Sequence, residues 1–187
     1  MFTLNYTKAI ILKTSSLGEA DKLYTLYTEK FGRIVVRGRS IRKGKLHMGM
    51  NLFSLVEVGF IQGKSYNTLT DVVGLFNFSR SRKSLSKLSL FYRISETLLF
   101  LLHGEEKEDS VFNLILDTMY EIENRNLSTR EISLVHTYFS FRLLDLLGYR
   151  PVTEECVVCK KELDAESYFS SSLSGVVCSH CSKVTPF

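Results

Sequence analysis

Two neighbouring segments, LYTLYT (Leu23–Thr28) and RIVVRGR (Arg33–Arg39), decide the fold of the first half of this chain. Both are rich in the β-branched and aromatic residues that are enriched in strands, and the turn signal Phe31-Gly32 separates them. Three further segments of the same character predict three more strands: Lys8–Lys13, Leu52–Ile61 and Tyr66–Leu75. Five short strands within about 75 residues predict a small closed barrel, and an OB-type barrel has that strand count and often binds nucleic acid. On strand count alone, an SH3-like barrel is a competitor.

The second half has apolar residues at helical spacing instead. Three segments carry this pattern: Leu85–Leu102, Val111–Ile122 and Ile132–Leu147. Ser128 with Glu131 makes a capping box at the start of the third helix, and Gly148 followed by Pro151 ends it. The expected fold class is therefore α+β, with an N-terminal five-stranded OB-fold barrel followed by a helical domain.

The change from strands to helices predicts two domains, an OB-fold DNA-binding domain at 1–78 and a helical domain at 79–187. The basic piece Asn77–Lys83 is the expected joint. Charge follows the same division, because residues 1–95 hold 16 Lys/Arg against 5 Asp/Glu, whereas residues 96–187 hold 8 against 15. Such asymmetry indicates a basic module with an anionic partner, joined to a module with another task.

All four cysteines lie near the end of the sequence in the pattern C-x2-C-x18-C-x2-C. This spacing falls in the range of a four-cysteine zinc site, in which each C-x-x-C knuckle aims two sulfurs at one tetrahedral ion. Four thiolates leave no open coordination position, so we expect one structural Zn²⁺ per chain at residues 156–181. The predicted ligands are Cys156, Cys159, Cys178 and Cys181.

Other interpretations of the cysteines are weaker. A thioredoxin-like C-x-x-C needs a βαβ setting, which the sequence does not indicate, and disulfides are rare in a reducing cytoplasm. A zinc-dependent hydrolase is disfavoured because the predicted metal shell is closed. His180, between two of the cysteines, is a possible substitute ligand but is expected to face solvent.

Lysines and arginines crowd the stretch from Lys30 to Lys45, which contains no acid. Because alternate residues of a strand share a face, three of its arginines are expected to project from one side of the barrel. Rows of cations suit a phosphate backbone, which they hold without reading sequence. A second basic cluster lies around the joint. The predicted DNA contacts are Arg33, Arg37, Arg39, Arg42, Lys43, Lys45, Arg80, Arg82 and Lys83.

Two qualifications apply to this DNA-binding prediction. Most charge runs are solvated faces, and the present one is distinguished by being acid-free, clustered and repeated. Nearby aromatic residues are candidate base-stacking platforms, although most of them are expected to belong to the core. These candidates are Tyr24, Tyr27, Phe31, Phe53 and Tyr66. Glu19 and Asp21, after a turn, could bind a cation but are expected to serve as a loop or strand cap.

The sequence contains no Walker A, dinucleotide, zinc-protease or G-x-S-x-G motif, so we expect no enzymatic activity. No apolar run reaches the roughly 18 residues that a membrane span needs. The first residues lack a basic region followed by a long apolar stretch, so no signal peptide is expected and the cytoplasm is the default compartment.

Two longer segments carry a resemblance to a known family. LGEADKLYTLYTEKFGRIVVRGRSIRK (Leu17–Lys43) resembles the N-terminal barrel of the bacterial recombination mediator family RecO. FSFRLLDLLGYRPVTEECVVC (Phe139–Cys159) resembles the last long helix of that family and its exit into a zinc knuckle. The order of barrel, helical bundle and four-cysteine site also agrees, so the resemblance spans nearly the whole chain.

The resemblance implies a DNA-binding protein of DNA repair and recombination, located in the cytoplasm and associated with the nucleoid. RecO-like proteins bind single- and double-stranded DNA, anneal complementary strands and engage the acidic tail of single-stranded DNA-binding protein. With RecR, they help RecA load onto coated single strands. The resemblance also implies that the basic strand and loop contact DNA and that the four cysteines are the zinc ligands.

Family members usually continue with further helical sequence after the second knuckle, whereas this sequence ends at Phe187. The family's acidic-tail pocket lies in the helical domain, and Arg93 and Arg142 are candidates to bind its carboxylates. An arginine with an internal ion-pair partner is an equally good interpretation of either residue. The alternative function is a zinc-containing adaptor whose basic face binds an acidic protein partner.

Overall fold

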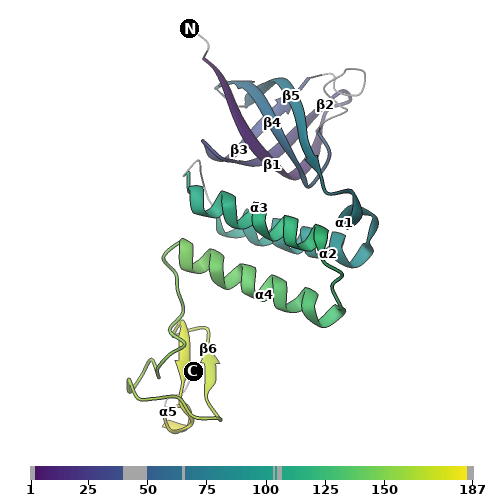
Figure 1. Cartoon of the computed structure of the whole chain (residues 1–187). Coiled ribbons are helices and arrows are strands. Elements are labelled where there is room, and N and C mark those ends of the chain that lie inside the picture. The colour runs from purple at the N-terminus through teal and green to yellow at the C-terminus, as the bar shows by residue number, and fades with distance from the viewer. Residues whose placement is uncertain (1–2, 40–49, 65, 103, 105–106, 185–187) are drawn as a thin grey trace. The chain divides into compact units, whose positions relative to one another are not determined.

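The computed structural model describes residues 3–39, 50–64, 66–102, 104 and 107–184. Its first part is a closed barrel of five strands (Figure 1). These are β1 (Leu4–Leu17), β2 (Asp21–Thr28), β3 (Gly32–Gly38), β4 (Ser54–Ile61) and β5 (Asn67–Asn77). Each of the five predicted segments overlaps one of these strands.

The barrel closes in the order β1-β2-β3-β5-β4, and β1 pairs with both β2 and β4. The pairing of β3 with β5 is parallel and the other pairings are antiparallel. A register shift between Ile11 and Lys13 lets the long first strand bend from one partner to the other. This strand order is that of the OB fold, so the predicted fold class is confirmed and the SH3-like competitor is set aside.

Alternation along β3 separates the inside of the barrel from the outside. Ile34 and Val36 are buried in the core, whereas Arg33, Val35 and Arg37 are partly exposed. The shared parity that the sequence predicts for the arginines is therefore present in the strand. The buried core of the barrel consists of Ala9, Ile11, Tyr24, Leu26, Ile34, Val36, Met50, Val56, Val58, Phe60 and Leu69.

Four helices follow the barrel: α1 (Ser79–Lys83), α2 (Leu85–Leu101), α3 (Asp109–Asn124) and α4 (Thr129–Leu146). The predicted capping box opens α4, because the amide of Ser128 donates to the Glu131 carboxylate at 2.8 Å and the Glu131 amide donates to the Ser128 hydroxyl at 3.4 Å. After α4, the Tyr149 amide donates to the Leu144 oxygen, with Gly148 at φ +79°. That left-handed conformation favours glycine and closes the helix as a Schellman motif.

Named contacts join the barrel to the helices. The Ser95 hydroxyl of α2 donates to the backbone oxygen of Leu12 in β1 at 2.7 Å. The Phe53 ring, just before β4, meets the Phe91 ring of α2 edge to face at a centroid distance of 5.5 Å. The part of the barrel surface next to these contacts is therefore covered by helix α2.

A buried carboxylate fastens the joint between barrel and helices. Glu123 of α3 accepts hydrogen bonds from the Ser81 hydroxyl at 2.6 Å, the Ser81 amide at 2.8 Å and the Arg80 amide at 3.0 Å. Burial opposes ionisation of this carboxyl, but the bonds from Ser81 and Arg80 outweigh it, so the pKa of Glu123 is lowered. The charged carboxylate thus holds α1 against α3.

The chain divides into two compact units, residues 1–140 and residues 141–187. The predicted domain boundaries at 78 and 79 stay a prediction. The second unit contains two short strands and a short helix: β6 (Tyr168–Ser170), β7 (Gly175–Val177) and α5 (Ser179–Val184). Among the described residues, no helix is long and apolar enough to cross a membrane.

Candidate metal centre and nucleic-acid interface

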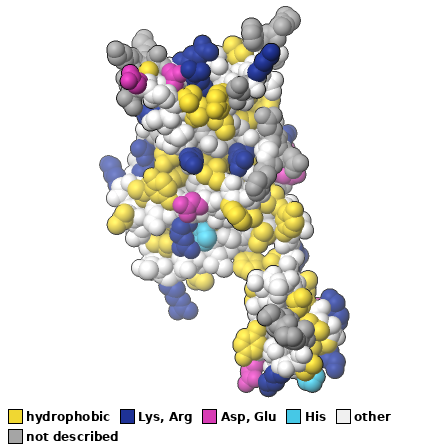
Figure 2. Space-filling model, turned by 180° about the vertical axis from the view of Figure 1, so that it is seen from behind, with side chains coloured by type: hydrophobic (Ala, Val, Ile, Leu, Met, Phe, Trp, Pro, Cys, Tyr) yellow, Lys and Arg dark blue, Asp and Glu magenta, His cyan; other side chains and the backbone are white. Residues whose placement is uncertain are grey.

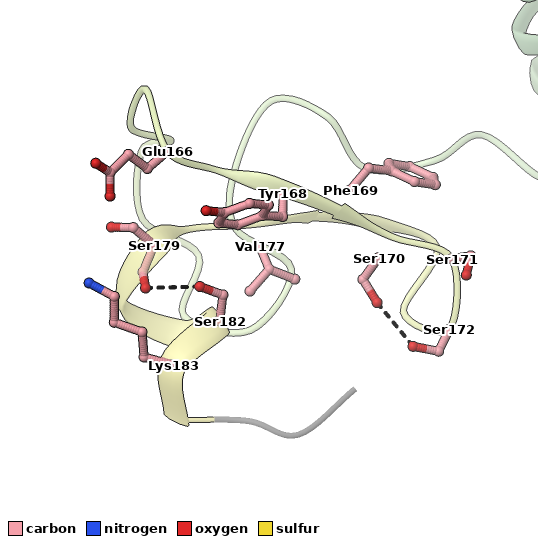
Figure 3. Close-up of a pocket in the computed structure, with 10 residues that line it drawn as sticks. All are labelled: Glu166, Tyr168, Phe169, Ser170, Ser171, Ser172, Val177, Ser179, Ser182 and Lys183. Carbon is pink, nitrogen blue, oxygen red and sulfur yellow. Dashed lines mark hydrogen bonds between the residues drawn. The ribbon is translucent and has the colours of Figure 1, made fainter.

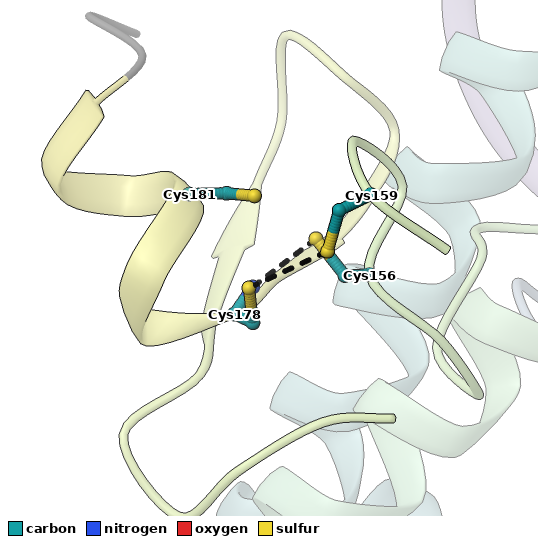
Figure 4. Close-up of side chains that lie close together, drawn as sticks. All are labelled: Cys156, Cys159, Cys178 and Cys181. Atoms are coloured by element: carbon teal, nitrogen blue, oxygen red, sulfur yellow. Dashed lines mark hydrogen bonds between the residues drawn. The ribbon is translucent and has the colours of Figure 1, made fainter. Parts of the chain in front are cut away.

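The four cysteine sulfurs converge in the second unit (Figure 4). All four Sγ atoms lie within 4.8 Å of one another, and three of the cysteines are buried. The Sγ atoms of Cys159 and Cys178 are 3.8 Å apart. A tetrahedral Zn²⁺ with Zn–S distances of about 2.3 Å would place neighbouring sulfurs about 3.8 Å apart, so the cluster fits such an ion.

Local backbone geometry aims each pair of sulfurs. In the first knuckle, the Lys160 amide donates to the Cys156 oxygen at 2.9 Å, and Lys160 takes a left-handed conformation at φ +60°. The second knuckle leads into α5, whose first residue, Ser179, donates both its amide and its hydroxyl to the Asp164 carboxylate. Cys181 lies one turn into that helix, so its sulfur faces the first knuckle.

The backbone of β7 lies close to the backbone at Val152, just before the first cysteine pair. Gly175 forms a parallel bridge with Val152, and the Val176 amide donates to the Val152 oxygen at 2.8 Å. A Cβ on Gly175 would lie 2.7 Å from the Val152 oxygen and would also meet the Val157 side chain. Glycine is therefore required at this position by space rather than by its φ angle.

The thiols are electrostatically unequal. The amide of Cys178, followed by that of Cys159, donates to the Cys156 sulfur, which lowers the pKa of Cys156 to about 6. Burial, together with the neighbouring thiols, raises the pKa of Cys181 to about 12. Four sulfurs this close cannot all ionise without a compensating cation, so the donor set is suited to a metal ion that takes thiolates.

Cations lie on the outer face of β1 and β3 and directly after β3. Arg37 pairs across the sheet with Leu23, and Lys13 shares a cross-strand row with Thr25. Lys13 and Arg39 are exposed, and Arg37 is partly exposed. Lys13 lies outside the basic run and was not among the predicted DNA contacts, but the register of β1, β2 and β3 places it on the same face as Arg37.

Both of the predicted DNA contacts on β3 have hydrogen bonds within the protein. Arg37 donates from Nε and Nη2 to Asp21 Oδ2, at 2.8 Å and 2.5 Å. Arg33 donates from Nη1 to the backbone oxygen of Leu99 at 3.0 Å, so part of its guanidinium serves the end of α2. Asp21, which the sequence suggested as a cation ligand or strand cap, thus has an arginine as its partner.

The remaining predicted DNA contacts fall into two groups. Around the joint, Arg80 and Lys83 are exposed, and Arg82 donates to the Asn77 side chain at 2.6 Å. Their assignment as DNA contacts stays a prediction. The other group, Arg42, Lys43 and Lys45, lies outside the described residues.

The structure separates the candidate stacking residues. Tyr24, Tyr27 and Phe53 are buried, and the Tyr24 hydroxyl is enclosed without a hydrogen-bond partner in the described part of the chain. Phe31 packs edge to face on Phe60 at 5.3 Å. Tyr66 is exposed, so of the five candidates it is the one whose ring is most accessible to a base.

The two candidate partner-binding arginines also differ. Arg142 pairs with Asp145 at 3.1 Å, as an internal ion pair would. Arg93 of α2 bonds instead to His136 Nδ1 of α4 at 3.0 Å, and His136 Nε2 lies 3.2 Å from the Thr97 hydroxyl. Burial, with the nearby Arg93 charge, lowers the pKa of His136, which matches its role as an acceptor for arginine.

Models of a known family match both halves of this sequence. The model for the N-terminal part of recombination protein O matches residues 1–78, and the model for its C-terminal part matches residues 82–187. The chain belongs to the RecO family. The OB barrel and the four-cysteine cluster of this RecO-family chain are thus the features that the sequence resemblance implied.

Individual relatives agree with this assignment. A DNA repair protein RecO of Dehalococcoides mccartyi is 32% identical over 178 residues, covering 94% of this chain and 69% of the relative. One of Caldanaerobacter subterraneus is 31% identical over 179 residues, covering 95% and 71%. One of Thermodesulfovibrio yellowstonii is 32% identical over 185 residues, covering 94% and 69%.

A shallow hollow of about 630 Å³ lies beside α5 in the second unit of this RecO-family chain (Figure 3). Tyr168 and Val177 supply apolar surface, Ser179 and Ser182 supply hydroxyl groups, and Lys183 lies at one side. Its other lining residues are Glu166, Phe169, Ser170, Ser171 and Ser172. No motif in the sequence indicated this hollow.

Hydrophobic side chains are exposed on the first unit as well. Figure 2 shows one face, on which they lie over both barrel and helices among scattered lysines and arginines. Several exposed apolar residues lie on strands of the barrel, notably Tyr6 on β1 and Val73 and Leu75 on β5. The barrel surface therefore carries both cations and apolar residues. Lys13 and Arg37 lie on β1 and β3, whereas Val73 and Leu75 lie on β5.

Proposed function

We propose that this chain is a DNA repair protein that binds single- and double-stranded DNA through its OB barrel and anneals complementary strands. The observation that carries the proposal is the set of cations at β1 and β3: Lys13 is exposed on the outer face that it shares with Arg37, and Arg39 is exposed just after β3. Family membership supports it, as do relatives named DNA repair protein RecO.

The physical basis is contact with phosphates. Lysine and arginine on an exposed strand face bind a phosphate backbone without reading base sequence, and displaced counterions make the binding weaken with salt. Lys13 and Arg39 are expected to contribute more than Arg37, because Asp21 already neutralises part of the Arg37 charge. Tyr66 is the candidate for stacking on an unpaired base.

We further propose that the protein acts with RecR and helps RecA load on single strands coated by single-stranded DNA-binding protein, whose acidic tail it engages. Arg93 is the favoured contact for that tail, because Arg142 already has Asp145 as its partner. The mechanism is binding and positioning, not bond making. In support, the carboxylates of Asp21, Glu123 and Asp164 each accept hydrogen bonds within the fold.

Zn²⁺ is the metal proposed for the cysteine cluster, with Cys156, Cys159, Cys178 and Cys181 as ligands. When bound, it would cross-link the two knuckles and complete a closed shell with no position for substrate. The expected role is structural, one ion per chain.

The central test is fluorescence anisotropy of a labelled single strand of mixed sequence, titrated with the full chain. About four phosphate contacts give a log–log salt slope near −3. Lys13→Glu combined with Arg39→Glu should weaken binding at least tenfold. Arg130→Glu, which changes an exposed arginine on α4, is the matched control and should change affinity less than threefold.

The alternative function, an adaptor that binds an acidic protein, is separated by two measurements. A mediator should accelerate the annealing of complementary strands, whereas an adaptor should bind an acidic peptide tightly and DNA weakly. A DNA affinity that does not change with salt concentration would overturn the proposal for the barrel face. So would an unchanged DNA affinity in the Lys13→Glu, Arg39→Glu double variant.

A further inference from the structure

An acid lies among the cations of the barrel face. Strand register pairs Leu23 with Arg37, and Asp21 lies two residues before Leu23 on β2. Residues two apart on a strand point to the same face, so Asp21 shares the face of Arg37. Lys13 lies on that face as well, because it pairs with Thr25, two residues after Leu23. Asp21 therefore places a negative charge on the surface that is proposed to bind DNA.

The hairpin between β1 and β2 fixes the position of this acid. Asp21 is the first residue of β2 and pairs with Leu17, the last residue of β1. The turn between them is short, and Gly18 takes a left-handed conformation at φ +64°, which favours glycine. The backbone of Asp21 is thus held by the hairpin, and its carboxylate is presented to β3 in a defined place.

The carboxylate of Asp21 binds one edge of the Arg37 guanidinium. Both Nε and Nη2 donate to the same oxygen, Oδ2, at 2.8 Å and 2.5 Å. Phosphate oxygens bind arginine through the same kind of charge-assisted hydrogen bond. The Arg37 side chain is 38% exposed, so a phosphate can reach it, whereas the Asp21 side chain is only 15% exposed. A phosphate that binds this edge takes the place of the carboxylate.

We propose that Asp21 competes with DNA phosphate for Arg37, and that a bound strand displaces the carboxylate from the guanidinium. This inference rests on the proposed binding of DNA by the barrel. Asp21 acts through Arg37, as a positioning residue. Because the carboxylate is part of the same chain, it competes at a high effective concentration. The competition lowers the affinity for a single strand and raises its dissociation rate, which favours release of the strand after it has paired with its complement.

The competition also changes the salt dependence of binding. An arginine that binds a phosphate of a single strand releases a counterion and adds about 0.7 to the steepness of the log–log salt plot. A carboxylate that loses its arginine attracts a cation from solution, which offsets this release. Arg37 therefore contributes little to the salt slope of the wild-type protein, even though it contacts phosphate.

The first test is fluorescence anisotropy with a labelled single strand, using the full chain and its Asp21→Asn variant. Asparagine has a similar shape but no charge to hold the guanidinium. The variant should bind about fivefold more tightly at low salt, with a salt slope steeper by about 0.7, and the strand should dissociate about fivefold more slowly. Glu19→Gln is the matched control, because Glu19 is exposed on the same hairpin. It removes the same charge and should change affinity less than about twofold, with an unchanged slope.

A double variant separates exchange at Arg37 from a general change of charge. In a chain that carries Arg37→Gln, adding Asp21→Asn should raise affinity no more than Glu19→Gln does, because no guanidinium is released. An equal gain in affinity with and without Arg37 would overturn the proposal. So would a salt slope that Asp21→Asn leaves unchanged.

The Nε–H resonance of Arg37 gives a test in the wild-type chain, which does not depend on the folding of any Asp21 variant. The resonance, assigned by its absence in Arg37→Gln, should move when the single strand is added to saturation, because its acceptor changes from carboxylate to phosphate. An unmoved resonance in a chain that binds the strand would overturn this inference alone. A wild-type chain that does not bind the strand would overturn the proposed DNA binding and this inference with it.

Discussion

The guanidinium of Arg33 donates a 3.0 Å hydrogen bond to the backbone oxygen of Leu99, so an arginine of the barrel supports the last turn of helix α2. The final carbonyls of a helix have no partner within the helix, and a cation at that end also complements the helix dipole. An arginine that the sequence assigns to DNA thus has a structural partner sixty-six residues away.

Replacing Arg33 should affect stability more than DNA binding. We expect Arg33→Met to lower the free energy of unfolding by about 1–2 kcal/mol, because a charge-assisted bond to a helix end is lost. Urea unfolding of this variant and of Arg39→Met provides the comparison, because Arg39 is exposed and has no hydrogen bond to a helix end among the described residues. A large loss of DNA affinity with an unchanged free energy of unfolding would show instead that Arg33 contacts DNA.

The carboxylate of Glu123 is expected to be a main support of the joint. Glu123→Gln should lower the free energy of unfolding by about 1–3 kcal/mol, because the amide group would face a donor from Ser81 or Arg80. Glu121→Gln is the matched control on the same helix. Its ion pair with Arg125 is solvent-exposed, so a change below about 0.5 kcal/mol is expected. Equal effects in the two variants would contradict this role.

The contact of His136 with Arg93 should make stability depend on pH. An arginine side chain can only donate hydrogen bonds, so Nδ1 of His136 accepts the bond from Arg93. The proton of the neutral ring is then on Nε2, which donates to the Thr97 hydroxyl. Because the pKa of His136 is lowered by folding, the unfolded chain binds more protons near its ordinary pKa of 6.5. Stability should therefore fall as pH decreases from 7.5 towards 5.5.

Comparison with His136→Gln isolates this contribution, since glutamine offers an acceptor but does not titrate. The wild-type free energy of unfolding should decrease more steeply with acid than that of the variant. Nitrogen shifts of the imidazole should report the Nε2–H form. Parallel pH profiles for the two proteins would exclude His136 as the titrating group.

Replacing one of the four proposed zinc ligands should affect the second unit and leave DNA binding unchanged. Cys178→Ser should abolish stoichiometric metal in elemental analysis, and amides of residues 152–184 should lose protection from hydrogen exchange. DNA affinity should remain within about threefold, since the cations of the barrel face lie in the first unit. A chelator that leaves the exchange of these amides unchanged would argue against a structural ion.

A backbone contact gives a second test of the same unit, in which the four cysteines are left unchanged. Gly175→Ala should weaken zinc binding and local protection, because the added Cβ meets Val152 and Val157. Gly74→Ala is the control, since a Cβ there has no neighbour within 4 Å. Equal behaviour of the two variants would show that the backbone at Gly175 can move aside.

The sequence by itself determined the parts whose signals are local. Strand composition and turn signals predicted all five barrel strands, Ser128 with Glu131 predicted the start of α4, and cysteine spacing predicted that the four cysteines come together. Each depends on residues close in sequence, or on a spacing that chemistry restricts. The alternation of Arg33 and Arg37 on one face of β3 follows from strand geometry in the same way.

Only the tertiary structure decided how those parts are used. The closing order of the strands selected the OB fold. Leu99 accepts a hydrogen bond from Arg33, and Asp21 accepts hydrogen bonds from Arg37, two arginines that the sequence predicted to contact DNA. Strand register places Lys13 on the same face as Arg37. These outcomes depend on which distant groups fold against each other, and a charge run does not encode its partners.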